Sequence, residues 1–408
     1  MKRSCSLVTA LLAMMLVLPA LAQEQQGRGH GRLDAHHRME RLGQSQGAWT
    51  ELPDARPSEV AEAVQTTHTY TLYVCAESDD IVEKVAFGPN GFIHLKSIPV
   101  GVWPTETEGP HGIVVSPDGK YWFVSIAHDQ PGPFGSVHKY DTATDTWRGE
   151  VELGMFPATL SISPSIGLLY VVNFNLHGLP RPSTISVVEP ESMSEVGRVG
   201  TGVMPHGSRM NREGTRQYSV NMMNDDLVEV DTYRMQVTRR LALSNAAPLQ
   251  LGGDGSSAAP PKPVVKPTWA TPTTPQGKLY VAGNGAATIF EVDVASWRIS
   301  RKFENTGKGP YNIDVTADGK ILVVTYKSDK SVGIWDLEKG VELARIDTLR
   351  PVPHGVVVSP DGSYAFVSIE GIGGEPGSVE AYDLKRLERV AHIDLAKQTG
   401  GIALWKVQ

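Results

Sequence analysis

The feature that most constrains this 408-residue chain is a repeat, seen most clearly in two nearly identical segments. Residues 111–126 read His-Gly-Ile-Val-Val-Ser-Pro-Asp-Gly-Lys-Tyr-Trp-Phe-Val-Ser-Ile, and residues 354–369 read His-Gly-Val-Val-Val-Ser-Pro-Asp-Gly-Ser-Tyr-Ala-Phe-Val-Ser-Ile. The copies that begin at 268, 311 and 354 are 43 residues apart. Weaker copies begin near Ala158, His206, Thr268 and Tyr311. A period of about 40–45 residues with four strands per unit indicates a β-propeller.

Each copy contains the pattern of four short strands. An apolar strand leads into a turn of the Pro-Asp-Gly type, because Asp and Gly tolerate the backbone conformations that such turns need. A second apolar strand follows, as at 121–124, then an alternating third strand, as at 331–336, and a more polar fourth strand, as at 342–346. Continuous apolar runs indicate strands buried on both faces, whereas a charged strand suits the exposed rim of a blade.

The two ends of the chain supply the halves of one further unit. Six complete copies cover residues 110–395. Residues 68–98 have the pattern of outer strands without a preceding inner strand, and residues 399–408 have that of an inner strand with nothing after it. We therefore predict an all-β, seven-bladed β-propeller with four-stranded blades. Its ring closes where the C-terminal strand pairs with the N-terminal blade, which removes the open edges.

The repeats resemble those of the YVTN family of β-propellers, a WD40-like class of repeat. Leu-Tyr-Val-Val-Asn at 169–173 and Leu-Tyr-Val-Ala-Gly-Asn at 279–284 come closest to the motif behind the name. The resemblance covers most of residues 68–408 and implies the propeller fold. Related rings include lactonase-like propellers, the heme d1 propeller of a nitrite reductase and the copper propeller of nitrous oxide reductase. A fold shared by such different proteins does not select one function.

The N-terminus has the composition of an export signal. Lys2 and Arg3 precede an apolar run at 7–20, and Ala20-Leu21-Ala22 matches a signal peptidase site, so residues 1–22 are predicted to be cleaved after Ala22. We therefore expect a periplasmic or secreted protein. No later stretch approaches the roughly 18 apolar residues of a membrane span. The net charge of −7 and the lack of a basic run argue against nucleic acid as a partner. We expect a monomer.

Two further segments differ in composition from the repeats. Residues 23–66 are polar and irregular, and we predict a flexible arm there, followed by the propeller at 67–408. Residues 244–266 include Gly-Gly-Asp-Gly-Ser-Ser-Ala-Ala-Pro-Pro-Lys-Pro, which predicts a surface loop within the propeller.

Histidines recur where the inner strands begin. In a propeller these starts lie around one mouth of the central channel, and three of the seven carry Pro-His-Gly. The predicted ligand-binding residues at this mouth are His111, His206, His354, Tyr311 and Trp269. A second tier is expected in the loops after the second strands, which contain His128, Asp129, His177, Asp329 and Glu370.

Three interpretations of the Pro-His-Gly histidines remain open. Imidazoles on one rim bind copper, zinc or iron, or act with a carboxylate as a catalytic base. Alternatively, Pro-His-Gly is scaffolding in which the imidazole forms hydrogen bonds between blades. We expect the three side chains to face the channel axis but to lie too far apart to share one ion without further ligands.

The function predicted from these patterns is binding of a protein or small molecule at the mouth of the channel. The first alternative is a metal- or cofactor-binding, redox-associated propeller in which His111, His206 and His354 hold a transition metal such as copper. The second is a lactonase-like hydrolase, for which no catalytic residue is assigned. The patterns leave open whether the protein is an enzyme.

Overall fold

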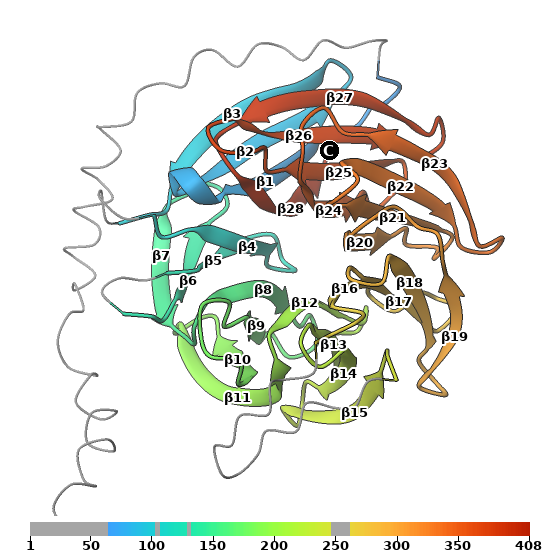
Figure 1. Ribbon diagram of the computed structural model, residues 1–408. Coiled ribbons are helices and arrows are strands. Elements are labelled where there is room, and N and C mark those ends of the chain that lie inside the picture. Colours follow the sequence, from blue (N-terminus) through green and yellow to red (C-terminus); the bar gives the residue numbers. More distant parts are fainter. Residues whose placement is uncertain (1–63, 103–106, 129–131, 246–261) are drawn as a thin grey trace, which may run out of the picture.

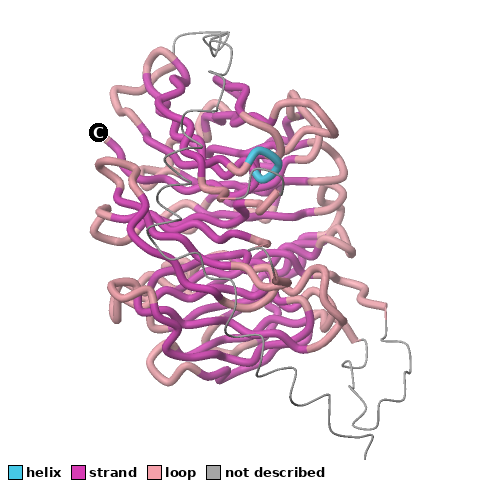
Figure 2. The backbone as a smooth tube through the Cα atoms, turned by 90° about the vertical axis from the view of Figure 1, so that its left-hand side faces the viewer, coloured by secondary structure: helices cyan, strands magenta, loops and turns pink. Residues whose placement is uncertain are grey.

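The computed structural model describes residues 64–102, 107–128, 132–245 and 262–408. Seven four-stranded antiparallel sheets, the blades, surround a central channel (Figure 1). Turned by 90°, the strands lie between two faces of loops (Figure 2). The predicted all-β, seven-bladed propeller is confirmed. Within the described ranges, no helix has the length and apolar character needed to cross a bilayer.

Blade 1 joins the two ends of the propeller. From the channel outward it contains β28 (Thr399–Val407), β1 (Tyr70–Ala76), β2 (Ile81–Gly88) and β3 (Gly91–Pro99), and the 3-10 helix η1 (Glu77–Asp79) lies between β1 and β2. The register pairs Tyr70 with Val407. Trp405 of β28 donates its Nε1–H to the carbonyl of Gly119 in blade 2 at 3.0 Å. The predicted closure of the ring by the C-terminal strand is therefore confirmed.

The other blades follow in chain order, each given from the channel outward. Blade 2 contains β4 (Pro110–Val115), β5 (Tyr121–Ile126), β6 (Ser136–Asp141) and β7 (Trp147–Glu152). Blade 3 contains β8 (Pro157–Ile162), β9 (Leu169–Asn173), β10 (Pro182–Glu189) and β11 (Ser194–Val203). Blade 4 contains β12 (Pro205–Met210), β13 (Arg216–Asn221), β14 (Asp226–Asp231) and β15 (Gln236–Ala242).

The second half of the ring repeats the same order. Blade 5 contains β16 (Pro267–Ala270), β17 (Lys278–Gly283), β18 (Thr288–Asp293) and β19 (Arg298–Phe303). Blade 6 contains β20 (Pro310–Val315), β21 (Ile321–Tyr326), β22 (Ser331–Asp336) and β23 (Val341–Asp347). Blade 7 contains β24 (Pro353–Val358), β25 (Tyr364–Ile369), β26 (Gly377–Asp383) and β27 (Glu388–Leu395).

The core lies between neighbouring blades, and the strand patterns explain why. Every residue of the second strands β9 and β25 is buried, whereas the outermost strands β15 and β23 alternate between exposed and half-buried positions. Apolar faces of adjacent blades stack on each other, as where the ring of Tyr73 in blade 1 lies 5.2 Å from that of Trp122 in blade 2. The turns between first and second strands use glycine, since Gly119 and Gly362 have φ of +70° and +68°. The inner strands are thereby left to line the channel.

The segments outside the repeats are described only in part. The predicted signal peptide and most of the predicted arm lie outside the described residues, so export stays a prediction. The last residues of the arm contact the ring: Val64 is buried in a cluster with Tyr70 and Phe366, and the carbonyl of Gln65 accepts a hydrogen bond from Tyr364 Oη at 3.2 Å. Packing against the ring therefore includes residues on the N-terminal side of the boundary predicted at residue 67.

The end of the predicted loop 244–266 is anchored to blade 4. The Asp225 carboxylate accepts backbone N–H bonds from Val264, Val265 and Lys266 at 2.7, 3.1 and 2.8 Å. Val265 is also buried in the cluster between blades 4 and 5. Residues 246–261 of the loop lie outside the described residues. The described end of this loop is therefore held against blades 4 and 5.

Candidate functional site

The seven inner strands present equivalent positions at one mouth of the channel. Hydroxyl groups on strands of one blade donate to carbonyls of the next, as from Ser125 to Ala158 at 2.9 Å and from Thr159 to His206 at 2.9 Å. Thr325 makes the same bond to His354 at 3.0 Å, and Ser368 makes it to Gly400. In blade order the seven positions are Gly400, His111, Ala158, His206, Thr268, Tyr311 and His354.

The three Pro-His-Gly histidines and Tyr311 gather at this mouth. The ring of His111 lies 5.7 Å from that of His354 and 6.3 Å from that of His206, measured between centroids. Tyr311 completes the group, at 4.8 Å from His354 and 5.5 Å from His206. The side chains thus meet at the mouth although the three histidines come from blades 2, 4 and 7, of which no two are neighbours.

His206 has partners for both ring nitrogens. Its Nδ1–H donates to the carbonyl of Thr268 in blade 5 at 2.9 Å, and Tyr311 Oη donates to its Nε2 at 3.1 Å. Burial lowers the pKa of this imidazole to about 3, so the ring is neutral, as both hydrogen bonds require. His206 therefore fits the interpretation in which the histidine links blades.

Trp269, the other residue predicted to bind a ligand at the mouth, supports His206. Its ring packs edge-on against that of His206 at 5.1 Å between centroids. Trp269 belongs to the core cluster between blades 5 and 6 and is 7% exposed. Trp269 also lines the cavity inside the channel.

His111 has only one partner among the described residues. Its Nδ1–H donates to Glu77 Oε1 at 2.7 Å, whereas its Nε2 is buried without a hydrogen bond. Burial lowers the pKa of His111, but the adjacent Glu77 carboxylate outweighs burial, and the pKa lies above its usual value. An imidazole oriented by a carboxylate with its second nitrogen unpaired is the arrangement found in metal ligands and catalytic bases.

His354 lies beside a second charged pair. Its Nε2 is 3.7 Å from Glu370 Oε1, and Glu370 accepts a hydrogen bond from Lys327 Nζ at 2.7 Å. Burial, together with the Lys327 ammonium, lowers the pKa of His354 well below its usual value, so the imidazole is neutral. Burial also raises the pKa of Glu370.

Glu77 completes a cluster that our reading of the sequence missed. Glu77, His111 and His354 each offer a ligand atom, and these atoms lie within 4.8 Å of one another. We expected the three histidines to need further ligands to share one ion, and Glu77 offers such a ligand beside His111 and His354. His206 does not belong to this cluster.

A glycine on the inner strand of blade 1 leaves space for the side chain of Glu77. Blade 1 has Gly400 at the position that histidines occupy in blades 2 and 7, and a Cβ atom there would lie 2.7 Å from Glu77 Oε1. Gln398 fixes the other carboxylate oxygen by donating its Nε2–H to Oε2 at 3.0 Å. Glu370 was predicted as a site residue because it follows the second strand of its blade. Glu77 directly follows β1, the second strand of blade 1, so the same criterion would have identified it.

The second tier divides into residues at the mouth and residues elsewhere. The rings of His128 and His177 lie 5.2 Å apart, and Phe156 connects them to His111 at 5.3 Å. Burial and the nearby His177 lower the pKa of His128. Asp329 instead accepts a backbone hydrogen bond from Lys308 and takes no part in the mouth cluster. Asp129 lies outside the described residues.

Comparison with known proteins supports the fold alone. No family model and no curated protein matches the chain. A chain of hydrazine synthase from Kuenenia stuttgartiensis is 17% identical with a TM-score of 0.54, covering 76% of this chain and 98% of that one. A proposed 6-phosphogluconolactonase from Bacteroides fragilis is 13% identical with a TM-score of 0.59, covering 84% and 99%. A protein from Lactobacillus plantarum is 12% identical with a TM-score of 0.62, covering 83% and 99%.

Those neighbours are seven-bladed propeller proteins, and their identities of 12–17% carry no assignment of activity. Membership of the YVTN family therefore stays a prediction, as do a ligand and a reaction. The side chains at the mouth have to support any functional proposal.

Proposed function

We propose that this protein binds one divalent transition-metal ion at the mouth of its channel through His111, His354 and Glu77. The observation that carries the proposal is the convergence of two buried imidazoles and a carboxylate from three separate parts of the chain. Neutral imidazoles and carboxylates are the ligands that zinc, copper and iron take in proteins. Among the functions that the sequence left open, this arrangement favours the metal-binding one.

The geometry requires a modest adjustment. Two ligands that bind one zinc ion tetrahedrally at about 2.1 Å lie about 3.4 Å apart, so atoms now up to 4.8 Å apart would approach by up to about 1.4 Å. A rotation of the Glu77 side chain would supply such a movement, at the cost of the hydrogen bond that Gln398 now donates to Oε2. The three residues leave further coordination positions open for a small ligand.

The charges around the cluster also suit a cation. Glu77 and Glu370 place two carboxylates at the mouth, and Lys327 pairs with Glu370. The ammonium group disfavours protonation of His354, which keeps that imidazole in the form that binds metals. An ion shared by His111 and Glu77 would take the place of the proton that now joins His111 Nδ1 and Glu77 Oε1, which lie 2.7 Å apart.

Calorimetric titration of the purified, chelator-treated protein with zinc chloride tests the proposal. We expect one equivalent of zinc to bind. His111→Ala and His354→Ala should each weaken binding by more than the roughly 10- to 100-fold that follows loss of a group outside the ligand set. His392→Ala, on the outer strand β27, is the matched control and should bind like the wild type. Absence of binding, or equal binding by all three variants, would refute the proposal.

A second candidate function rests on the bond between Glu77 and His111. A carboxylate that orients an imidazole and raises its pKa creates a general base, and the free Nε2 would accept a proton from water or substrate. This is the hydrolase alternative. Such chemistry would persist in the presence of a chelator, whereas a function of the metal site would be lost.

A further inference from the structure

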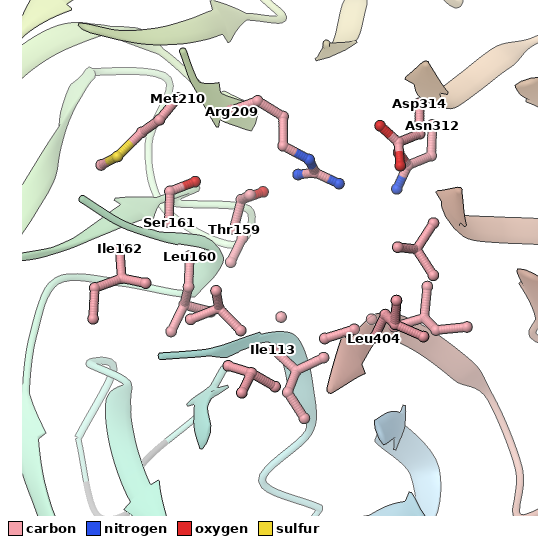
Figure 3. A pocket seen from close by; sticks show the side chains of 18 of the residues that line it. Ile113, Thr159, Leu160, Ser161, Ile162, Arg209, Met210, Asn312, Asp314 and Leu404 are labelled. Atoms are coloured by element: carbon pink, nitrogen blue, oxygen red, sulfur yellow. The ribbon is translucent and has the colours of Figure 1, made fainter. Parts of the chain in front are cut away.

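The channel contains a cavity of about 430 Å³ that extends from His111 and His354 at the mouth to a deeper part of the wall, which carries two opposite charges. Arg209 of β12 and Asp314 of β20 each lie three residues after the mouth position of their strand, so they form a deeper layer. Figure 3 shows their side chains extending into the same space from different walls, with Asn312 beside Asp314. Cavities of this size hold small molecules in other proteins.

Arg209 keeps most of its hydrogen-bonding capacity free for the cavity. The guanidinium donates one bond, from Nη1 to the carbonyl of Ser208 at 3.0 Å, and lies 5.2 Å from the centre of the Trp269 ring. No carboxylate of the described residues forms an ion pair with it. Burial lowers the pKa of Arg209, with Asp314 as the charge that opposes this shift.

Asp314 is held in place by the backbone. Its Oδ2 accepts from the N–H of Val358 at 2.9 Å and its Oδ1 from the N–H of Val315 at 2.9 Å. Burial raises the pKa of this carboxyl group. Arg209 and Asp314 are both half-buried without a direct ionic partner, and a ligand could offset the resulting loss of hydration.

The rest of the wall is mainly apolar. It is formed by aliphatic side chains on the inner strands of blades 1, 2, 3 and 7, which include Ile113, Val114, Leu160, Val357, Ile402 and Leu404. A ligand that fits would therefore have a hydrocarbon part, an anionic group to face Arg209 and a hydrogen-bond donor to face Asp314. The hydroxyl-bearing residues Thr159 and Ser161 lie between the apolar and charged parts of the wall (Figure 3).

We propose that this cavity binds a small organic acid whose carboxylate pairs with Arg209 and whose hydroxyl or ammonium group donates to Asp314. Arg is suited to a carboxylate because its guanidinium offers two parallel N–H donors. The aliphatic wall would hold the hydrocarbon part of the acid. This proposal goes beyond the metal site at the mouth and does not depend on it.

Three acids with the same carbon skeleton test the inference by calorimetry in the presence of EDTA, which removes any contribution from bound metal. They are leucine, 2-hydroxy-4-methylpentanoate and 4-methylpentanoate. We expect one or both of the first two to bind, and the unsubstituted acid to bind at least about tenfold more weakly, because it leaves Asp314 without a donor. Which of the first two binds tighter identifies the donor as ammonium or hydroxyl.

Two variants assign the binding to the charged layer. Arg209→Gln should weaken binding of the preferred acid by about 30-fold or more, and Asp314→Asn should remove most of its advantage over 4-methylpentanoate. The exposed Arg298→Gln and Asp318→Asn serve as controls and should match the wild type. If Arg209→Gln does not fold, Arg209→Lys keeps the charge and should still lose about tenfold, because it lacks the paired donors. No binding of any acid at millimolar concentration, or unchanged binding in the Arg209 variants, would overturn the proposal. Equal affinity for all three acids would overturn the role of Asp314.

Discussion

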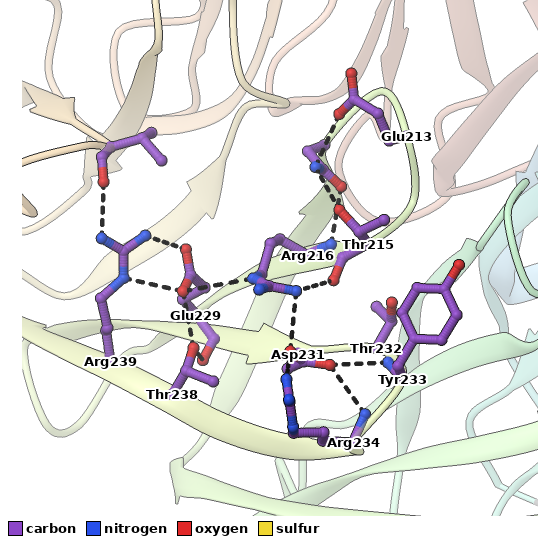
Figure 4. A network of polar contacts seen from close by, with 12 residues as sticks. Glu213, Thr215, Arg216, Glu229, Asp231, Thr232, Tyr233, Arg234, Thr238 and Arg239 are labelled. Atoms are coloured by element: carbon purple, nitrogen blue, oxygen red, sulfur yellow. Dashed lines mark hydrogen bonds and ion pairs between the residues drawn. The ribbon is translucent and has the colours of Figure 1, made fainter.

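Two groups of buried polar residues in this propeller differ in how completely they are paired. In blade 4, the carboxylate of Glu229 accepts hydrogen bonds from Thr238 Oγ1 at 2.7 Å and from Arg239 Nε at 2.9 Å, and Arg216 lies at 3.8 Å (Figure 4). The neighbouring Asp231 is bonded to Arg234 and Arg216. At the mouth of the channel, by contrast, His111 leaves one buried nitrogen without a partner among the described residues.

This difference in hydrogen bonding distinguishes residues that stabilise the fold from residues that are available to bind a ligand. A buried carboxylate whose two oxygens both accept hydrogen bonds stabilises one arrangement of the blade and has no oxygen left without a donor to bind a ligand. A buried nitrogen without a hydrogen bond carries a cost that a ligand could offset, although scaffold atoms such as Gln217 Oε1 in blade 4 also lack a partner among the described residues. The same contrast exists within one motif, because His206 has both nitrogens bonded and His111 does not.

The largest effect on stability is expected from Glu229→Gln. The substitution removes the charge that Arg239 and Arg216 face, and the free energy of unfolding should fall by about 2–4 kcal/mol. Denaturant unfolding measures the change. Glu195→Gln, which breaks an exposed pair with Arg198, should cost no more than about 0.5 kcal/mol. Equal effects of the two substitutions would show that the buried network around Glu229 contributes no more to stability than an exposed ion pair.

A smaller loss of stability is expected from His206→Phe. Phenylalanine retains the packing of the ring but leaves the carbonyl of Thr268 and the hydroxyl of Tyr311 without their partner, which should cost about 1–3 kcal/mol. Zinc affinity should stay within about threefold of the wild type, since His206 is not one of the proposed ligands. A large loss of zinc affinity in a folded His206→Phe protein would place this histidine in the metal site.

The architecture was predictable from the sequence because the repeat is a local pattern. Turn residues, apolar runs and the two incomplete end units each indicate a blade without knowledge of any other, and together they predicted seven blades and the pairing of β28 with β1. The partners of the histidines were not predictable in this way. Identical Pro-His-Gly triplets at 111 and 206 acquire different partners because other blades offer Glu77 in one case and Thr268 and Tyr311 in the other.

The position of Arg209 and Asp314 at one depth of the channel also depends on how different inner strands are aligned. Arg209 and Asp314 were not singled out in the sequence, because a single Arg and a single Asp on different inner strands carry no local signal. Counting three residues from His206 and Tyr311 places both at one depth. That register could have been applied to all seven strands once the ring was predicted.

The smallest effect on stability, with a clear effect on the proposed site, is expected from Gly400→Ala. The added methyl group would lie 2.7 Å from Glu77 Oε1 and 3.8 Å from His354 Cε1, so Glu77 must move out of the cluster. Zinc affinity should fall about tenfold or more while the melting temperature changes little. Gly200→Ala is the matched control, because a Cβ there meets no atom within 4 Å. Unchanged zinc affinity in Gly400→Ala would show that Glu77 is not a ligand.

Anomalous X-ray diffraction from crystals of the protein grown with zinc chloride tests the central claim most directly. The account predicts one strong zinc peak in the mouth of the channel, within about 2.0–2.2 Å of an imidazole nitrogen of His111, one of His354 and an oxygen of Glu77. The peak should be absent from crystals of the His111→Ala, His354→Ala double variant. Zinc found only on surface residues, or at the mouth in both crystals, would contradict it.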